Sequence, residues 1–398
     1  MEQQPRIAVV GAGIGGLALA LGLARAGLSC DVYEQTRHLR EIGAGLQVAP
    51  NAARLLHRLG VESCLRAVAV RPRAIELRRW NDGGLLARTP LGEECEEMYG
   101  APHYAVHRAD LHQILLSKLP AGTLRLGLRC VGVEQHGEEA VLRFEDGSTR
   151  RADLVVGADG IHSATRDLLV KDEPRYSGQD MYRGLVPAER LPHLAAEPAV
   201  RLWLGPGRHF VCYPVAGGSR ISFAATAPGG DRRPEESWNT PGRVEELRAA
   251  YDGWHGDVAA VLAAAGEVGR WALHDRDPVP GWSRGRVTLL GDAAHPMLPF
   301  RAQGANQAVE DAAALVVCLT EHGGTDLPER LRRYERVRMT RTARIQQISR
   351  DNAKTLHLPD GAGQRHRDAA LGGSHELAAQ DWLFGYDAAE AARAEPLR

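Results

Sequence analysis

The sequence predicts an α/β fold in which a Rossmann-like sheet is joined to an inserted antiparallel β-sheet and to C-terminal helices. Three patterns support this prediction. Residues 7–34 read as strand, glycine-rich turn, apolar helix and second strand, which is the order of a parallel βαβ unit. Residues 181–225 alternate apolar and polar side chains, as antiparallel sheets with one covered face do. Residues 327–355 form a long, arginine-rich helical stretch.

Composition excludes several classes of protein. The 398 residues are 44% hydrophobic and 25% charged, which is typical of globular proteins. A net charge of −1, from 49 basic and 50 acidic side chains, gives no field that would gather nucleic acid or an anionic membrane. The six cysteines form no C-x-x-C pair and no zinc-like spacing with histidine, so we expect no metal site and a cytoplasmic protein.

The first unit contains a G-x-G-x-x-G turn between the predicted strand Ile7–Val10 and the predicted helix Leu17–Ala26. Glycine there permits a tight turn, close approach of a pyrophosphate and packing of helix on strand. The helix N-terminus adds free N–H groups and a positive dipole end. Glu34 ends the second strand, Cys30–Tyr33, where a carboxylate can accept hydrogen bonds from a ribose. The alternative is an ordinary surface glutamate.

The following segments predict the rest of both sheets. A helix is expected over Asn51–Leu59 with Asn51 as its N-cap, and another over Arg108–Leu119. Strands are expected between Arg73 and Arg88 and in a meander from Val131 to Phe144. Further strands are predicted at Tyr182–Val186, Val200–Leu204, Phe210–Val215, Arg220–Ala225 and Arg286–Leu290, and helical periodicity at Val244–Ala265 and Gln307–Leu319.

Two further motifs follow apolar strands. Leu154–Val156 leads into Gly157, Asp159 and Gly160 and then into a helix that we expect Ser163 to cap. Alone, this motif would be a plain strand-to-helix turn. Val287–Leu290 leads into Gly291-Asp292, a proline-rich bend and Gly304 before an alanine-rich helix. Asp292 can bind a polyol, and the helix after Gly304 can stabilise negative charge on a planar ligand.

Together and in this order, the three motifs resemble the single-component (group A) FAD-dependent aromatic hydroxylases, the family of 6-hydroxynicotinate 3-monooxygenase, salicylate hydroxylase and 3-hydroxybenzoate 6-hydroxylase. The resemblance covers residues 5–355. It implies an FAD-binding domain of the glutathione-reductase and p-hydroxybenzoate hydroxylase type, formed by residues 1–72, 101–178 and 280–340. Residues 73–100 and 179–279 would form the substrate-binding β-sheet domain, and 341–398 a C-terminal helical segment and tail.

The resemblance also assigns cofactor contacts. Glu34 would hold the adenosine ribose, Val131 the adenine, and Asp292 the ribityl chain, and Gln35 is also expected to bind the cofactor. Gln47, in the segment 43–51, would lie near the flavin, and Arg108 would contact FAD. Asp159 belongs to a motif that the family uses for both FAD and NAD(P)H. The remaining assigned residues are Gly11, Gly13, Gly15 and Gly16 at the pyrophosphate, and Ala302, Gly304, Ala305 and Asn306 at the flavin pyrimidine edge.

The activity that the resemblance implies is hydroxylation of an electron-rich aromatic or hydroxypyridine ring. Non-covalent FAD would be reduced by NAD(P)H as a transient co-substrate, and O₂ would react through a flavin C4a-hydroperoxide. The alternatives are a tailoring hydroxylase of a larger phenolic or pyridinol natural product, a non-hydroxylating flavoprotein reductase, and a nucleotide-binding module without catalysis. The expected partner is a small aromatic substrate, and the expected state is a monomer or homodimer.

Substrate contacts are expected on one predicted strand. His209, Val211 and Tyr213 share a face by the period of two. His209 and Tyr213 resemble the pair that binds substrate and removes a proton in 6-hydroxynicotinate 3-monooxygenase. The alternative is a His and a Tyr on an exposed sheet. Phe300 and Arg301 are also expected at the substrate, although many relatives have Tyr-Met or a similar pair there. A cationic arginine at this position could address an anionic group, and the alternative is a surface arginine. His295 is expected to be structural.

Overall fold

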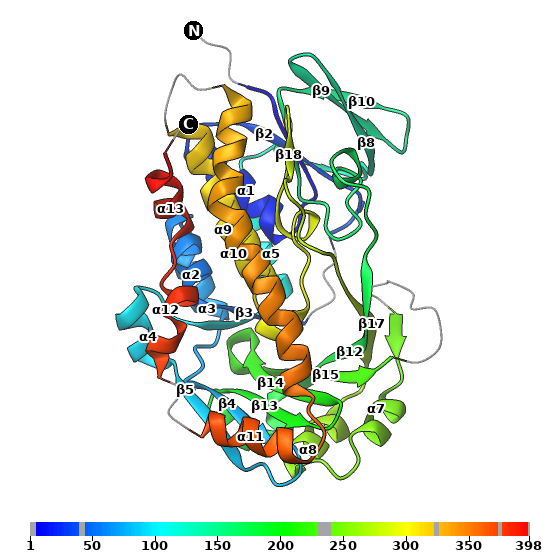
Figure 1. The fold of residues 1–398 in the computed structure, drawn as a ribbon, viewed down its shortest axis with the longest axis vertical. Helices are drawn as coiled ribbons and strands as arrows, with labels where there is room; N and C mark the ends of the chain where they lie inside the picture. The colour runs from blue at the N-terminus through cyan, green and yellow to red at the C-terminus, as the bar shows by residue number, and fades with distance from the viewer. Residues whose placement is uncertain (1–4, 40–43, 230–239, 322–325, 373–375, 397–398) are drawn as a thin grey trace.

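Two large sheets and one long helix dominate the computed structural model, which describes residues 5–39, 44–229, 240–321, 326–372 and 376–396. Helix α10 (Leu327–Leu356) lies against α9 (Gly304–Thr320) beside the first sheet and continues down to the second (Figure 1). The predicted α/β architecture is confirmed. Among the described residues, no helix is long and apolar enough to span a membrane.

The first sheet has six strands in the order β18-β19-β11-β1-β2-β7. Neighbours from β19 to β7 are parallel, and β18 pairs antiparallel with β19. The predicted Rossmann-like sheet is therefore present, with one antiparallel edge strand. Its strands are β1 (Ile7–Val10), β2 (Cys30–Glu34), β7 (Leu124–Leu126), β11 (Leu154–Gly157), β18 (Ser283–Arg284) and β19 (Val287–Leu289).

Helix α1 (Ile14–Arg25) packs against α9 beside this sheet because glycines permit close approach. A Cβ atom on Gly16 would lie 2.1 Å from the carbonyl oxygen of Gly11. A Cβ atom on Gly15 would lie 2.6 Å from Leu290 and 2.9 Å from Ala308. Gly15 and Gly16 are thus required by packing as well as by any ligand.

The second sheet has eight strands in the order β16-β17-β12-β15-β14-β13-β4-β5. All neighbours pair antiparallel except β13 and β4, which are parallel. A core of large apolar side chains joins this sheet to α7 (Val244–Ala250) and α8 (Gly256–Ala264). The strands are β4 (Ala74–Arg79), β5 (Leu85–Pro90), β12 (Arg175–Pro187), β13 (Val200–Gly205), β14 (Arg208–Val215), β15 (Arg220–Pro228), β16 (Thr240–Gly242) and β17 (Val268–Asp275).

Smaller elements complete the fold, and the domain boundaries given above remain a prediction. The small sheets are β3 (Gly45–Val48) with β6 (Tyr104–His107), and β8 (Cys130–His136) with β9 (Glu139–Phe144) and β10 (Thr149–Ala152). The other helices are α2 (Pro50–Arg58), α3 (Glu62–Val68), α4 (Gly92–Tyr99), α5 (Arg108–Ser117), α6 (Pro192–Ala196), α11 (Ala362–Leu371), α12 (Asp381–Phe384) and α13 (Ala388–Ala394). Single 3₁₀ turns are η1 (Arg166–Leu168), η2 (Ala188–Arg190), η3 (Ala216–Gly218), η4 (Gly291–Ala293), η5 (Pro299–Arg301) and η6 (Leu377–Gln380).

Two local predictions are wrong, and a third stretch is helical as predicted but divided. Asn51 is not the N-cap of α2, which begins at Pro50 after Ala49; its side chain is buried and bonds to α9. Ser163 caps no α-helix; its hydroxyl accepts the Arg166 N–H, and only the turn η1 follows. The periodic stretch 244–265 is two helices, because the chain turns at 251–255 around Gly253, whose φ is 75°.

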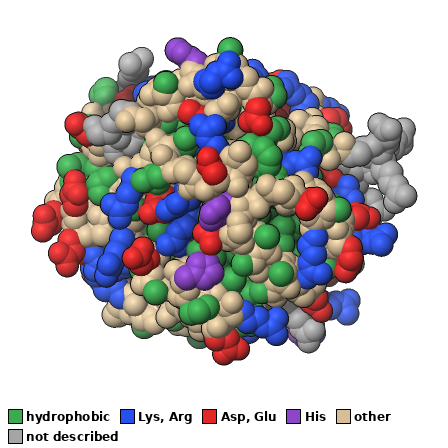
Figure 2. Space-filling view, turned by 90° about the horizontal axis from the view of Figure 1, so that it is seen from below, with side chains coloured by type: hydrophobic (Ala, Val, Ile, Leu, Met, Phe, Trp, Pro, Cys, Tyr) green, Lys and Arg blue, Asp and Glu red, His purple; other side chains and the backbone are tan. Residues whose placement is uncertain are grey.

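The lower end of the molecule carries charges of both signs, interspersed with apolar side chains (Figure 2). This face has no region of a single sign, in keeping with the net charge of −1.

A buried ion cluster joins α9 to α10. The Arg338 guanidinium donates to Glu310 at 2.5 Å and to Asp311 at 2.7 Å, and all three side chains are inaccessible to solvent. Burial alone would raise the pKa of both acids. Arg338 and Arg341 outweigh it at Glu310, and His295 and Arg338 hold the pKa of Asp311 at about 2. Both carboxylates are therefore ionised at neutral pH.

Removing the central cation should destabilise the protein strongly. We expect Arg338→Met to lower the free energy of unfolding by about 3–5 kcal/mol, because two buried carboxylates lose their shared partner. Arg332→Met, which removes an ion pair at a side chain that is 56% exposed, is the matched control and should cost less than about 1 kcal/mol. Urea denaturation followed by circular dichroism measures both changes; equal midpoints would contradict the assigned role of the cluster.

Candidate active site

A cavity of about 540 Å³ lies between the two large sheets. One wall is formed by residues that follow β1, β11 and β19, at the carboxyl ends of the parallel strands, where ligands bind in open α/β sheets. The opposite wall is the face of the eight-stranded sheet, from Arg183 on β12 to Thr89 on β5. The C-terminal segment, with Gln380 and Phe384, forms the outer end.

The glycine-rich turn leaves the N-terminus of α1 open. Gly13 is the N-cap residue, no side chain caps the helix, and a Cβ atom on Gly13 would meet no described atom within 4 Å. The Glu34 carboxylate lies beside this turn, where it accepts the N–H of Ala12 at 3.0 Å and that of Thr36 at 2.9 Å. Free N–H groups and open space at a helix N-terminus suit a pyrophosphate.

Four further predicted cofactor residues line the parallel-sheet side of the cavity. Asp292 and Arg108 both face it. Burial raises the pKa of Asp292, while the charges of His295 and Arg108 act in the opposite direction. Gly304 and Ala305 begin α9 at the same wall.

Ala302 lies at the same wall in a strained conformation. Ala302 has a left-handed φ of 52°, which is unusual for a residue with a Cβ atom. His295 bonds to Asp311 at 2.6 Å and is buried, as expected for a structural residue.

Two other predicted residues have side chains that are hydrogen-bonded within the protein. The Asn306 side chain is committed to the protein: it accepts the Ala49 N–H and donates to the carbonyls of Gln47 and Ala302. The Asp159 carboxylate accepts hydrogen bonds from Ser163 and Thr165 in its own loop. Their contacts with a cofactor stay predictions.

Two predicted residues lie at the surface, away from the cavity walls. Val131 is 49% exposed on β8, and Gln35 is exposed after β2. Residue 43, at the start of the predicted flavin loop, lies outside the described residues.

His209, Val211 and Tyr213 all line the cavity from β14. His209 is 4% exposed and Tyr213 is 8% exposed, so the alternative of an exposed sheet face does not hold. Burial raises the pKa of Tyr213 to about 12 against the opposing effects of the Arg183 charge and the Gln47 side chain. Burial also lowers the pKa of His209 well below its usual value. Both side chains are neutral at neutral pH.

Phe300 and Arg301 also line the cavity, through the turn η5. One Arg301 nitrogen donates to Gln380 Oε1 at 2.5 Å, while its buried Nε has no hydrogen-bond partner among the described residues. Burial lowers the pKa of Arg301, and the part of the chain that the structure describes places no carboxylate within 4 Å of it. A buried cation without a counter-ion is costly and attracts an anion.

Sequence reasoning missed four polar residues around this cavity. Arg183 lines it from β12 and lies over the Trp271 ring at 4.1 Å. His103 lines it with both ring nitrogens buried and unpartnered among the described residues. Gln179 and His357 lie behind His209. None belongs to a motif, and only the alternation of the β12 segment could have indicated Arg183.

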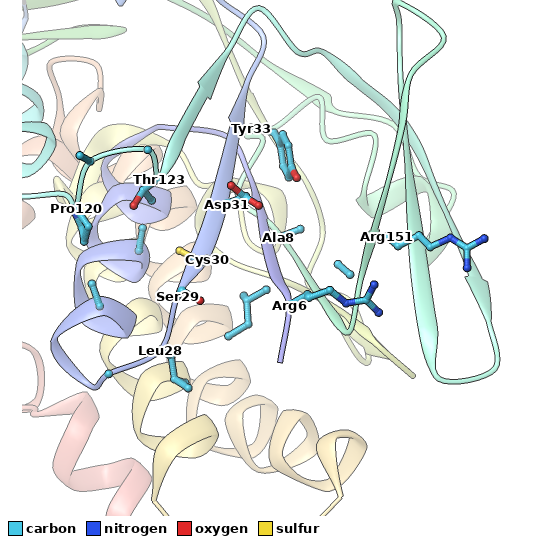
Figure 3. A pocket seen from close by; sticks show the side chains of 17 residues that line it. Arg6, Ala8, Leu28, Ser29, Cys30, Asp31, Tyr33, Pro120, Thr123 and Arg151 are labelled. Atoms are coloured by element: carbon cyan, nitrogen blue, oxygen red, sulfur yellow. The ribbon is translucent and has the colours of Figure 1, made fainter. Parts of the chain in front are cut away.

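Another hollow lies at the opposite end of the parallel sheet, between β1, β2 and the C-terminal end of α1 (Figure 3). Its cations are already paired: Arg6 with Asp153 and Glu139, and Arg151 with Glu139. It contains none of the predicted site residues. No group of three or more His, Cys, Asp or Glu side chains within the described ranges could hold a metal ion.

Comparison with known proteins points to one family. The family model described as FAD binding domain matches residues 5–349. The chain is 49% identical to 3-amino-4-hydroxybenzoate 2-monooxygenase PtmB3 of Streptomyces platensis, over 98% of both chains. It is 38% identical to 6-hydroxynicotinate 3-monooxygenase of Bordetella bronchiseptica, over 100% of this chain and 98% of that one. The structure of a salicylate hydroxylase substrate complex superposes with a TM-score of 0.84 at 29% identity, covering 100% and 99% of the chains.

The described residues fit FAD. The open N-terminus of α1 suits its pyrophosphate, Glu34 lies at the end of β2 for the ribose, and Asp292 faces the cavity for the ribityl chain. When bound, FAD supplies the electron transfer and oxygen chemistry that these side chains cannot perform.

Two carboxylates should govern FAD retention. Glu34→Ala and Asp292→Ala each remove an acceptor to a cofactor hydroxyl, worth about 1.5–3 kcal/mol, so FAD affinity should fall roughly ten- to hundredfold. Glu94→Ala, on the exposed face of α4, should leave affinity unchanged. Fluorescence titration of the apoprotein with FAD measures all three, and wild-type affinity in either variant would refute that residue's assignment.

Proposed function

The chain belongs to the family of FAD-dependent aromatic-ring monooxygenases, and from this premise we propose that it hydroxylates an aromatic carboxylate with a ring hydroxyl and a neighbouring amino group. The observation that carries the proposal is the buried Arg301 guanidinium, which faces the cavity without a carboxylate partner in the described chain. The reaction uses NAD(P)H and O₂, as in the family.

Arg301 is the better of two candidates for the substrate carboxylate. Its free Nε leaves guanidinium capacity for a charge-assisted hydrogen bond. Arg183 lies over Trp271 and also lines a smaller hollow with Asp292 and His162, on the side of the predicted ribityl site. The relatives described above are named for 3-amino-4-hydroxybenzoate, 6-hydroxynicotinate and salicylate, all of which are hydroxylated aromatic carboxylates.

The remaining walls suit a flat, neutral ring. Val211, Phe300 and several leucines supply apolar surface, while His209 and Tyr213 supply polar groups on one face. Asp292 is the one acidic side chain among the described residues that line the cavity. An ammonium would find little stabilisation at the Arg301 end, so an amino group would bind there in its neutral form, with its lone pair available to the ring.

Chemistry and identity together favour the amino-substituted benzoates. In 3-amino-4-hydroxybenzoate, carbon 2 lies next to the amino group, so a neutral amine makes that carbon electron-rich. The protein named for this reaction is 49% identical to the chain, against 38% for the hydroxynicotinate enzyme. The buried walls would also exclude water from the reacting ring.

A substrate screen tests the proposal. Holoenzyme is incubated with NADH or NADPH and with 3-amino-4-hydroxybenzoate, 3-hydroxybenzoate, 6-hydroxynicotinate, salicylate or larger phenols. We expect hydroxylated product from 3-amino-4-hydroxybenzoate at the highest kcat/KM, measured by mass spectrometry. Preference for a substrate without a carboxylate would overturn the proposal, and NAD(P)H oxidation without any hydroxylated product would favour a reductase.

Arg301 should set the preference for a carboxylate. Arg301→Met should weaken binding of 3-amino-4-hydroxybenzoate by about 10- to 100-fold, the value of one charge-assisted interaction. Binding of the uncharged 3-amino-4-hydroxybenzamide should change little. Flavin absorbance titrations measure both Kd values. The control is Arg344→Met, which changes an exposed arginine that lies over the Trp382 ring at 4.2 Å. A selective loss in Arg183→Met instead would place the carboxylate at Arg183.

We also infer a cytoplasmic enzyme that works as a monomer or homodimer on a small aromatic partner. All six cysteines are free, which suits a reducing compartment. Mass photometry and analytical ultracentrifugation measure the oligomeric state directly.

A further inference from the structure

Behind His209, a second imidazole and an amide form a chain of hydrogen bonds. His209 Nδ1 lies 2.7 Å from His357 Nε2, and His357 Nδ1 lies 2.8 Å from Gln179 Nε2. The two rings are nearly parallel, at 18°, with centroids 5.0 Å apart. The edge of Phe300 packs against both. His357 follows α10 and Gln179 lies on β12, so three distant segments meet here.

The contact between the two rings must hold a single proton. Two imidazole nitrogens at 2.7 Å form a hydrogen bond only if one donates and the other accepts. Burial lowers the pKa of His357 to about 4 and that of His209 well below its usual value, and a charge on His357 would lower the latter further. Both rings are therefore neutral, and each carries one N–H.

Gln179 determines which ring nitrogen of His357 carries the proton. The Gln179 amide faces His357 Nδ1 with its Nε2, which can only donate, so in this orientation His357 Nδ1 accepts; the amide Oε1 is buried without a hydrogen-bond partner among the described residues. The proton of His357 then lies on Nε2 and is donated to His209 Nδ1. His209 must in turn carry its own proton on Nε2, the nitrogen left for the cavity that this side chain lines.

Thr226 does not compete with this arrangement. Its hydroxyl oxygen accepts the backbone N–H of His209 at 2.9 Å, and the hydroxyl lies 3.3 Å from the backbone carbonyl of His209. It lies 3.4 Å from both His209 Nδ1 and His357 Nε2, farther than the two nitrogens lie from each other.

We propose that His357 and Gln179 are positioning residues that hold His209 in the Nε2–H tautomer, so that His209 donates a hydrogen bond to a substrate oxygen. This role differs from the proton removal that the sequence resemblance implies, since an Nε2–H imidazole cannot accept a proton on that nitrogen. Donation stabilises a phenolate-like oxygen, and the neutral ring adds no charge beside the cavity's arginines. The identity of the oxygen rests on the proposed function; the tautomer does not.

The tautomer can be measured without turnover. In FAD-loaded enzyme labelled with ¹⁵N-histidine, long-range ¹H–¹⁵N correlation spectra distinguish a protonated from an unprotonated Nδ1 and Nε2. His209→Gln and His357→Gln assign the two sets of signals. At neutral pH we expect both histidines as Nε2–H. Nδ1–H at His209 in the wild-type enzyme would overturn the proposal.

Three variants test which residues fix the tautomer of His209. Gln179→Met removes the donor to His357, so His209 should become a mixture of tautomers; Gln347→Met, an exposed glutamine on α10 that bonds to Asp351, is the matched control and should change nothing. His357→Leu should also release His209. In His357→Gln the new amide can still donate to His209 Nδ1, so a larger fraction of His209 should stay in the Nε2–H tautomer than in His357→Leu. An unchanged His209 tautomer in Gln179→Met would overturn the role of Gln179.

Product formation gives an independent measure. In Gln179→Met and His357→Leu, hydroxylated product per NAD(P)H consumed should fall by about tenfold, with H₂O₂ rising, while FAD binding is unchanged; His357→Gln should recover part of the loss. Equal coupling in all three would overturn a positioning role. Failure of the substrate proposal has a different signature: 3-amino-4-hydroxybenzoate would give no product although His209 still shows the Nε2–H tautomer.

Discussion

The buried contact of Arg338 with Glu310 and Asp311 fixes the geometry on which the cavity depends. The two acids are consecutive on α9, so their side chains leave the helix about 100° apart, and one guanidinium from α10 bonds to both. Each acid has further partners. Asp311 accepts the Gly291 N–H and bonds to His295, whereas Glu310 accepts from Asn51 on α2. Because three fully buried charges are tolerated only with complete hydrogen bonding, none of these elements can shift independently.

Helix α9 also fixes the position of residues at the cavity. Asn306 lies one turn before Glu310 and ties the carbonyls of Gln47 and Ala302 together. Gln47 lines the cavity together with Tyr213 of the opposite wall. From the other side, the buried Arg166 donates to the carbonyls of Ala293 and Ala294 and pairs with Asp172. The loop that presents Asp292 is therefore held from both flanks, which is how a rigid first layer of contacts is normally built.

What could be predicted from the sequence was local or periodic. The glycine turn, the strands before Asp159 and Asp292, and the shared face of His209 and Tyr213 follow from spacing alone, and the structure has them. Asn51 misled because Asn near a helix start usually caps it, whereas here a buried carboxylate 259 residues away in sequence binds its amide. His357 and Gln179 had no signal: their partners are separated by 148 and 178 residues, and nothing in the intervening chain marks the contact.

The distribution of charge connects these observations to chemistry. The whole chain is balanced at −1, yet the described cavity walls hold Arg108, Arg183, Arg301 and Arg367 against Asp292. Arg367 is paired with Asp368, so the excess positive charge of the cavity walls comes from the other three arginines, which lie nearer the proposed substrate and flavin positions. An anionic dinucleotide and an anionic substrate each neutralise part of it. A histidine that became cationic at the same wall would add to the surplus, which is a physical reason for keeping His209 and His357 neutral and for using an N–H, not a charge, to hold the substrate oxygen.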